Sequence, residues 1–263
     1  MQPGVFLASL VFVCGNLCFM TDLSLPRVRR PIVRPNFDPK EQPWQVANSG
    51  LLRVSPELLT PDALRGSLRP ARQWTLDPLG MEKERYPGRE GPPVLAAVLI
   101  PMVMRPQGVS VMLTQRAAHL HDHAGQISFP GGRVELADLT PVATALREAH
   151  EETGLPQDRV EVLNSMPEFL TSTGFSITPV VSLVRPDFAP AADAFEVADI
   201  FEVPLDFLMD PSNHRLYEAR LPDGRVRRYY AIPWGERFIW GATAGMLRNL
   251  YTSLASRPSV SVG

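Results

Sequence analysis

The stretch from Thr140 to Gly154 constrains the fold of this chain most, because both of its ends carry helix signals. Thr140 is a suitable N-cap and Pro141 fits the first helical position. Gly154 can adopt the left-handed conformation that commonly ends a helix. The sequence therefore predicts a helix that begins near Thr140 and stops at Gly154.

Two apolar segments precede this helix. Residues 94–104 form an almost continuous apolar run, which is typical of a buried strand. Residues 109–114 are expected to be its neighbour across the turn at 105–108. The other expected elements are strands over 160–165, 177–184 and 225–232, a closing helix over 241–254 and short helical pieces over 56–65. Strands and helices of these lengths predict an α/β (or α+β) sandwich.

The acidic residues of the predicted helix share one face. With about 100° per residue and Glu148 at zero, Glu152 falls at about +40° and Glu151 at about −60°. The positions on another sector are expected to pack inward: Val142, Leu146, Ala149 and Thr153. Carboxylates this close repel one another unless a cation lies among them, and Mg²⁺ or Mn²⁺ suits such oxygen ligands. A solvated acidic face is the plain alternative.

Arg147 precedes Glu151 by four residues. This spacing brings the two side chains close enough on a helix to form an ion pair. Arg147 is therefore expected to fix the orientation of the Glu151 carboxylate.

Composition excludes some classes of function. A net charge of −2 argues against long-range capture of nucleic acid by a basic surface, and the cluster Arg27 to Arg34 is interpreted as a solvated arm. The cysteines are Cys14 and Cys18, so no disulfide framework is available to the body of the chain. This cysteine usage favours a reducing, cytoplasmic location.

The N-terminal region is harder to interpret. The apolar run Val5 to Val13 resembles the core of a signal peptide, but no Lys or Arg precedes it and it is too short to span a membrane. A degenerate signal, a flexible apolar tail and a start codon assigned too early remain open, and we favour the last, with Met20 as the start. The expected parts are an apolar tail over 1–19, a Pro- and Arg-rich extension over 20–90 that wraps the main domain, and that domain over 91–256.

The segment from Gly132 to Leu155 resembles the Nudix box. That pattern is a Gly, five residues, a Glu, seven residues, and then Arg-Glu-aliphatic-any-Glu-Glu-any-Gly-aliphatic. Arg147 to Leu155 match the second half at every specified position. The first half departs by one residue, because the acid after Gly132 is Asp138 and eight residues separate it from Arg147.

Motifs upstream of the box resemble one branch of this family, the coenzyme A pyrophosphatases. The branch carries Leu-Thr-x-Arg-Ser/Ala, then His-Ala-Gly-Gln, then Phe-Pro-Gly-Gly-x-x-Asp. This chain reads Leu113-Thr114-Gln115-Arg116-Ala117, His123-Ala124-Gly125-Gln126 and Phe129-Pro130-Gly131-Gly132-Arg133-Val134-Glu135. It departs at Glu135, where the branch usually has Asp, and at His121, where Arg is common. Residues 195–197, 203–205 and 239–243 also resemble the branch, so the likeness covers roughly residues 90 to 255.

The resemblance implies a Nudix α/β/α sandwich with a mixed sheet, here over residues 91–256. It also implies hydrolysis of coenzyme A or a derivative to 3′,5′-ADP and 4′-phosphopantetheine, with Mg²⁺ or Mn²⁺ as cofactor. Glu148 and Glu152 are then the expected metal ligands. Glu151 is expected to share ligation or to position water, and Arg147 to belong to the catalytic group.

The resemblance also implies contacts with the substrate. Gly131 or Gly132 is expected to present backbone to the metal or the phosphates, because a residue without Cβ permits close approach. Arg116 is expected to bind substrate phosphates, since arginine is a good bidentate donor. Glu196 is a candidate further metal ligand, and an exposed glutamate at the start of a helix is its equal alternative.

Other interpretations stay open. His119, His121 and His123 alternate, so a three-histidine zinc site is a minor alternative to substrate-phosphate or structural roles. Trp234 and Trp240 are expected in the core rather than in ligand stacking. Alternative functions are hydrolysis of ADP-ribose or a dinucleotide and a non-catalytic binding module, although the intact second half of the box argues against the latter. A small nucleotide is the expected partner, with no nucleic acid and no membrane; a homodimer stays open.

Overall fold

The computed structural model describes residues 37–68, 73–79, 91–120, 125–221 and 224–256, all of which belong to one compact unit over 32–263. The strands are β1 (Trp44–Val46), β2 (Val94–Arg105), β3 (Gly108–Arg116), β4 (Ile127–Ser128), β5 (Gly131–Arg133), β6 (Val160–Ser165), β7 (Phe169–Leu170), β8 (Phe175–Val184), β9 (Val197–Pro204), β10 (Arg215–Arg220), β11 (Val226–Trp234) and β12 (Arg237–Trp240). The α-helices are α1 (Pro61–Leu68), α2 (Pro141–Thr153), α3 (Leu205–Leu208) and α4 (Ala242–Ala255), with 3₁₀ turns η1 (Pro56–Leu59), η2 (Gln157–Arg159) and η3 (Pro211–Asn213). The predicted mixture of helices and strands is confirmed.

The larger sheet is mixed, as predicted. Its central path is β4-β3-β2-β8-β6, with β5 paired to β2, β7 to β8 and β9 to β3. β2 and β8 run parallel, with Val98 opposite Pro179, whereas β2 and β3 form an antiparallel hairpin. The parallel pair needs a long crossover, and that crossover contains α2.

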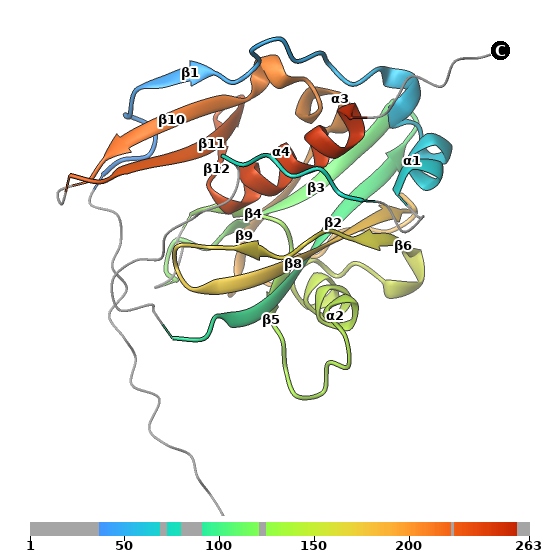
Figure 1. The fold of residues 1–263 in the computed structure, drawn as a ribbon. Coiled ribbons are helices and arrows are strands. Elements are labelled where there is room, and N and C mark those ends of the chain that lie inside the picture. Colours follow the sequence, from blue (N-terminus) through green and yellow to red (C-terminus); the bar gives the residue numbers. More distant parts are fainter. Residues whose placement is uncertain (1–36, 69–72, 80–90, 121–124, 222–223, 257–263) are drawn as a thin grey trace, which may run out of the picture. The chain divides into compact units, whose positions relative to one another are not determined.

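Both faces of this sheet are covered, which explains the unbroken apolar sequence of β2. Side chains at the odd positions Ala97, Leu99 and Val103 pack in one core cluster with α2. Those at the even positions Ile100 and Met102 pack in a second cluster with α1, α3 and α4. Figure 1 shows α2 and α4 on opposite sides of the central strands.

Local sequence sets both ends of α2. The Thr140 side chain accepts a hydrogen bond from Ala143 N at 3.1 Å, and Pro141 occupies the first turn. Gly154 takes a left-handed conformation with φ of 66°, and its N–H donates to His150 O. An N-cap of this kind contributes about 1 kcal/mol. The predicted helix is therefore confirmed at both ends.

A second, smaller sheet has the order β1-β10-β11-β12. One face of it carries an aromatic cluster in which Tyr217 and Tyr229 stack at 5.4 Å between ring centroids. Phe37 stacks on Tyr229 at 6.0 Å, and Trp240 meets the same ring edge-on at 5.5 Å. This cluster holds the first described residues of the chain against β11.

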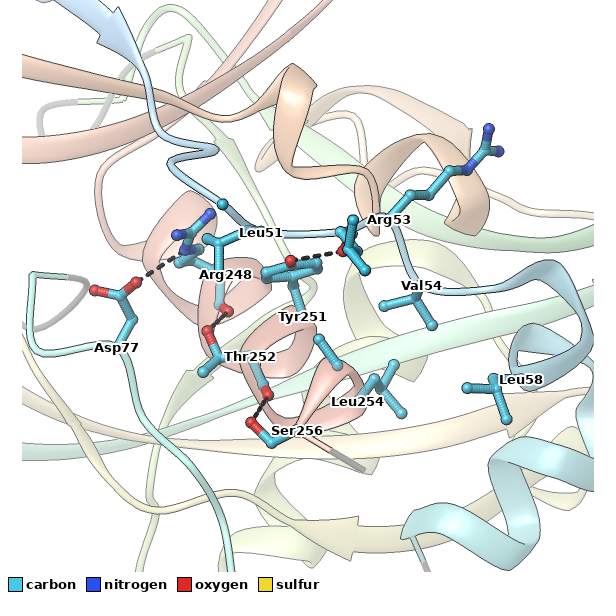
Figure 2. A pocket seen from close by; sticks show the side chains of 13 residues that line it. Leu51, Arg53, Val54, Leu58, Asp77, Arg248, Tyr251, Thr252, Leu254 and Ser256 are labelled. Atoms are coloured by element: carbon cyan, nitrogen blue, oxygen red, sulfur yellow. Dashed lines mark hydrogen bonds and ion pairs between the residues drawn. The ribbon is translucent and has the colours of Figure 1, made fainter. Parts of the chain in front are cut away.

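The segment after β1 packs along α4 (Figure 2). Arg248 donates from Nε to Asp77 Oδ2 at 2.9 Å and from Nη1 to Ala47 O at 2.9 Å. The Tyr251 hydroxyl donates to Leu52 O at 2.8 Å. These groups border a cavity of about 410 Å³. Residues 47–79, where described, are thus bound to the C-terminal helix by buried polar contacts.

Several predicted elements are confirmed with shifted ends, and some elements of the structure were not predicted. The strand predicted over 160–165 is β6, and those predicted over 177–184 and 225–232 are the longer β8 and β11. The helical pieces over 56–65 are η1 and α1. Strands β1, β4, β5, β7, β9, β10 and β12 were not predicted. Within the described ranges no helix is long and apolar enough to cross a bilayer. Outside the described residues lie the tail over 1–19, the cluster Arg27 to Arg34 and part of the predicted N-terminal extension.

Candidate active site

The acidic face of α2 lies against the turn that leads into β5. Ala145 and Ala149, on the adjoining sector of the helix, anchor it in the core. Val142 and Leu146 pack partly buried against the same cluster, as their positions on the helix predicted. The carboxylates therefore face the glycine pair that precedes the helix in sequence.

Glu152 is the most enclosed of these carboxylates. It is 4% exposed, and its Oε2 accepts a hydrogen bond from Gly131 N at 3.1 Å. Burial, with a smaller contribution from the neighbouring carboxylates Glu148 and Glu196, raises the pKa of Glu152 to about 8. The Arg116 guanidinium, 3.8 Å away, opposes this shift without cancelling it. The site therefore disfavours a bare negative charge at this position.

Glu148 lies directly against Gly132. A Cβ on Gly132 would overlap the Glu148 carboxylate, so a larger residue there would displace this side chain. Arg147 Nη1 donates to Glu148 Oε1 at 3.0 Å. Burial raises the pKa of Glu148, and the charges of Glu151 and Glu196 act in the same direction.

Gly131 is also held by close packing. A Cβ at this position would lie 2.6 Å from Val98 Cα and 2.7 Å from Val98 Cγ1 on β2. β5 can therefore approach β2 only with glycine here. This approach places Gly131 N where it binds Glu152.

Arg147 connects the carboxylates. Its predicted pair with Glu151 is present, with Nη1 and Oε2 separated by 3.0 Å. Sequence reasoning missed its principal partner, Asp138, which accepts from Nη2 at 2.8 Å and from Nε at 3.1 Å. The Arg147 guanidinium holds the pKa of the Asp138 carboxyl far below its usual range. Asp138 also accepts from the Thr144 hydroxyl at 3.0 Å. The residue that departs from the box pattern thus fixes the guanidinium between Glu148 and Glu151.

Glu151 differs from the other two carboxylates. Its side chain is 55% exposed, against 17% for Glu148 and 5% for Glu152. The three carboxylates of the predicted face therefore differ in exposure, with Glu152 the most buried and Glu151 the most exposed. Glu151 is free to meet water, while the other two face the interior of the site.

Arg116 ends β3 and points toward the same site. Its Nε is buried and has no hydrogen-bond partner within the described residues. Its Nη1 lies 3.8 Å from Glu152 Oε1, which is too long for a hydrogen bond. A buried donor without a partner is costly, so this guanidinium has unused capacity for an anionic ligand.

Glu196 lies in a turn that immediately precedes β9, and not at the start of a helix as the alternative interpretation assumed. Its carbonyl accepts from Ala117 N at 2.8 Å, which fixes the turn beside the end of β3. Its charge raises the pKa values of both Glu148 and Glu152. The candidate ligand from outside the box is thus brought to the carboxylate group.

The other candidates have different surroundings. His119 is exposed and meets the Phe195 ring edge-on at 5.2 Å, while His121 and His123 lie outside the described residues. Trp234 and Trp240, expected in the core, are half-buried and line a large cleft.

A single cleft of about 1440 Å³ joins these groups to the smaller sheet. At one end lie Arg116, Gly131, Gly132, Glu148 and Glu196. At the other lie Asp38, Lys40, Arg227, Phe238 and Trp240, and the walls between include Thr171, Ser172, Thr173 and Phe175. The volume exceeds that needed for a diphosphate alone and suits a larger ligand.

The donor chemistry fits a hard divalent cation. Among the described residues, no three His, Cys, Asp or Glu side chains converge closely enough to hold a metal ion in the present arrangement. Glu148 and Glu152 nevertheless present carboxylate oxygens in a buried position where burial penalises uncompensated negative charge. A cation with oxygen ligands would offset that penalty. Glu148 and Glu152, with Glu196 beside them, are the residues that could hold it.

Comparison with known proteins agrees with this architecture. Residues 93–217 match the NUDIX domain. The chain is 40% identical over 163 residues to a protein of Enterobacter sp. (strain 638) named "Uncharacterized Nudix hydrolase NudL", covering 62% of this chain and 84% of that protein. Its counterpart of the same name in Escherichia coli (strain K12) is 42% identical over the same coverage. A solved Nudix hydrolase of M. smegmatis, RenU, is 21% identical, with a TM-score of 0.44 over 64% of this chain and 89% of that one.

The chain therefore belongs to the Nudix hydrolase family. Members of this family generally use divalent metal ions. The family membership makes the chain a hydrolase and removes the non-catalytic binding module from consideration.

Proposed function

We propose that this protein hydrolyses the diphosphate bond of coenzyme A or its derivatives, releasing 3′,5′-ADP and 4′-phosphopantetheine. The observation that carries the proposal is the position of Arg116. This residue belongs to the motif that resembles the coenzyme A pyrophosphatases, and it lines the same cleft as Glu148 with a buried Nε that lacks a partner. The motif and the box thus meet around one space that suits a diphosphate.

Glu148 and Glu152 are the proposed ligands of Mg²⁺ or Mn²⁺, with Glu196 as a further ligand. The bound cation would polarise a phosphoryl oxygen and lower the pKa of a water molecule. Arg147 holds the Glu148 carboxylate in place, because Asp138 fixes its guanidinium from the other side. These contacts keep the ligand oxygens oriented before substrate binds.

Other groups of the chain act on the substrate and on water. Glu151 is the proposed group that orients or deprotonates the attacking water, since its carboxylate is the most exposed of the three. Gly131 and Gly132 line the cleft, and their backbone is the proposed contact with the diphosphate. The Arg116 guanidinium would donate to a phosphoryl oxygen and stabilise the charge that develops there.

The size of the cleft supports a substrate with a large group on each side of the diphosphate. The cleft continues past Phe175 to the indoles of Trp234 and Trp240. Aromatic walls of this kind suit a nucleobase. A small nucleotide alone would leave much of the space unfilled.

The test is hydrolysis of coenzyme A, an acyl-coenzyme A, ADP-ribose, NADH and a diadenosine polyphosphate, each with Mg²⁺, Mn²⁺ or EDTA. We expect metal-dependent release of 3′,5′-ADP from coenzyme A, detected by chromatography. The variant Glu152→Gln should lose on the order of a hundredfold or more in kcat, since it removes a charged metal ligand. Glu218→Gln is the matched control, because Glu218 pairs with Arg228 on the far face of the smaller sheet.

The outcomes separate the candidates. Turnover of ADP-ribose or a dinucleotide in preference to coenzyme A would overturn the substrate assignment and leave the family chemistry intact. Equal losses in the Glu152 and Glu218 variants would overturn the assignment of the metal ligands.

A further inference from the structure

The N-terminal segment places a lysine at the end of the cleft remote from α2. The Tyr229 hydroxyl donates to Pro39 O at 2.8 Å, and Phe37 stacks on the same tyrosine ring. Lys40 N donates to Asp38 Oδ1 at 2.8 Å, which closes a tight turn. Backbone and ring contacts therefore fix the residues around Lys40, although its side chain is exposed.

The Lys40 ammonium has capacity for an anion. Its Nζ lies 5.8 Å from the centroid of the Phe238 ring and forms no ion pair with a described residue. Two of the acidic residues that line the cleft already have partners. The Asp38 carboxylate accepts a hydrogen bond from the backbone N–H of Lys40, and Asp199 is paired with Arg237 at 2.6 Å.

A second cation lies on the same face of the smaller sheet. Arg227 and Tyr229 are two residues apart on β11, so their side chains point to the same side. The charges of both Arg227 and Asp38 act on the pKa of the Tyr229 hydroxyl, so both residues lie near this tyrosine. Arg227 Nη2 donates to Ser172 Oγ at 3.3 Å, and Ser172 is 4% exposed. A guanidinium anchored by a buried hydroxyl thus faces the same space as Lys40.

We propose that Lys40 and Arg227 form a second anion-binding position that recognises a phosphate monoester on the substrate, separate from the diphosphate that is cleaved. The inference rests on the proposed function, because it assigns the far end of the same cleft. It identifies the preferred substrates as diphosphates whose nucleoside half carries an additional phosphate, as the 3′-phosphate of coenzyme A does. A dianionic monoester suits a lysine and an arginine together, since both donate charge-assisted hydrogen bonds.

The assignment gives the N-terminal segment a role in specificity. Residues 37–40 approach the cleft from outside the box and from outside the central sheet. A substrate that lacks the extra phosphate would make no contact with Lys40 and Arg227. Discrimination would then come from a contact far from the reacting atoms, which acts on binding more than on the chemical step.

The experiment compares coenzyme A with dephospho-coenzyme A, which lacks only the 3′-phosphate. For Lys40→Met and for Arg227→Met we expect the ratio of kcat/KM for coenzyme A over dephospho-coenzyme A to fall roughly tenfold, the effect of one charge-assisted contact. Calorimetric binding of 3′,5′-ADP relative to 5′-AMP should fall by a similar factor, independently of turnover. Arg228→Met is the matched control, because Arg228 points to the opposite face of β11 and pairs with Glu218.

The results distinguish failure of this inference from failure of the proposed function. Equal kcat/KM for the two substrates in the unaltered protein would overturn the second anion position while leaving coenzyme A hydrolysis standing. A ratio that stays constant in both Met variants, or that falls as far in Arg228→Met, would also overturn it. Cleavage of neither substrate, with ADP-ribose cleaved instead, would overturn the proposed function itself.

Discussion

Acid should destabilise this protein through His214, a buried histidine just before β10. Its Nε2 lies 2.8 Å from Leu208 O, which can only accept, and its Nδ1 lies 3.1 Å from Arg248 Nη1, which can only donate. The imidazole is therefore neutral with the proton on Nε2. A second proton on Nδ1 would point at a guanidinium in a site with no solvent exposure.

The magnitude follows from the lowered pKa. Burial, aided by the charge of Arg248, lowers the pKa of His214 to about 4 from an ordinary 6.5. Between these two values the unfolded chain binds a proton that the folded chain does not, so stability falls as the pH drops through this window. Linkage gives a loss of about 2.5 kcal/mol in the free energy of unfolding between about pH 7.5 and about pH 4.5. Above the window both states are neutral and the contribution is complete.

Urea unfolding followed by tryptophan fluorescence at a series of pH values measures this loss. The variant His214→Gln can still donate to Leu208 O and accept from Arg248, but it does not titrate. It should be less stable at neutral pH, yet its free energy of unfolding should fall by about 2.5 kcal/mol less on acidification, since the carboxylates contribute equally to both proteins. Parallel pH profiles for the two proteins would refute the neutral, buried histidine.

Two further predictions concern the orientation of the carboxylates on α2. Asp138→Asn removes the charge that holds Arg147, so kcat should fall about tenfold to a hundredfold with little change in KM, measured by steady-state kinetics with saturating metal. An unchanged kcat would show that the guanidinium needs no such support. In Gly132→Ala the added methyl would overlap the Glu148 carboxylate, so turnover should fall about a hundredfold. Gly66→Ala, which meets no atom within 4 Å, is its control and should retain full turnover.

The sequence predicted α2 well because its signals are local. Thr140, Pro141 and Gly154 act through contacts within a few residues, and the carboxylate spacing depends only on the helix period. The apolar run of β2 was equally clear, because burial on both faces leaves no polar alternation to obscure it. The sequence thus predicts best those elements that are determined by residues close to them in the chain.

The remaining parts depend on distant contacts. β9 was missed because its burial is irregular along the strand. Pairing with β3 decides the structure of β9, and pairing with β11 decides that of β10. Asp138 was recognised only as a departure from a pattern, since its bond with Arg147 depends on the loop before α2 folding back onto the helix. Lys40 gave no signal at all. Its place in the cleft follows from the contact between Tyr229 and Pro39, which are 190 residues apart.

Helix α4 joins the two regions that sequence reasoning left separate. Its first turn lines the cleft, and the Thr243 hydroxyl donates to Ile127 O beside the upstream motif at 3.1 Å. Its middle binds residues 47–79 through Arg248, which Asp77 and His214 hold in a buried position. Because one rigid element carries both sets of contacts, loosening the buried network would shift the wall of the cleft as well as release the segment. Residues 47–79 therefore help to shape the substrate site, as the strands of the central sheet do.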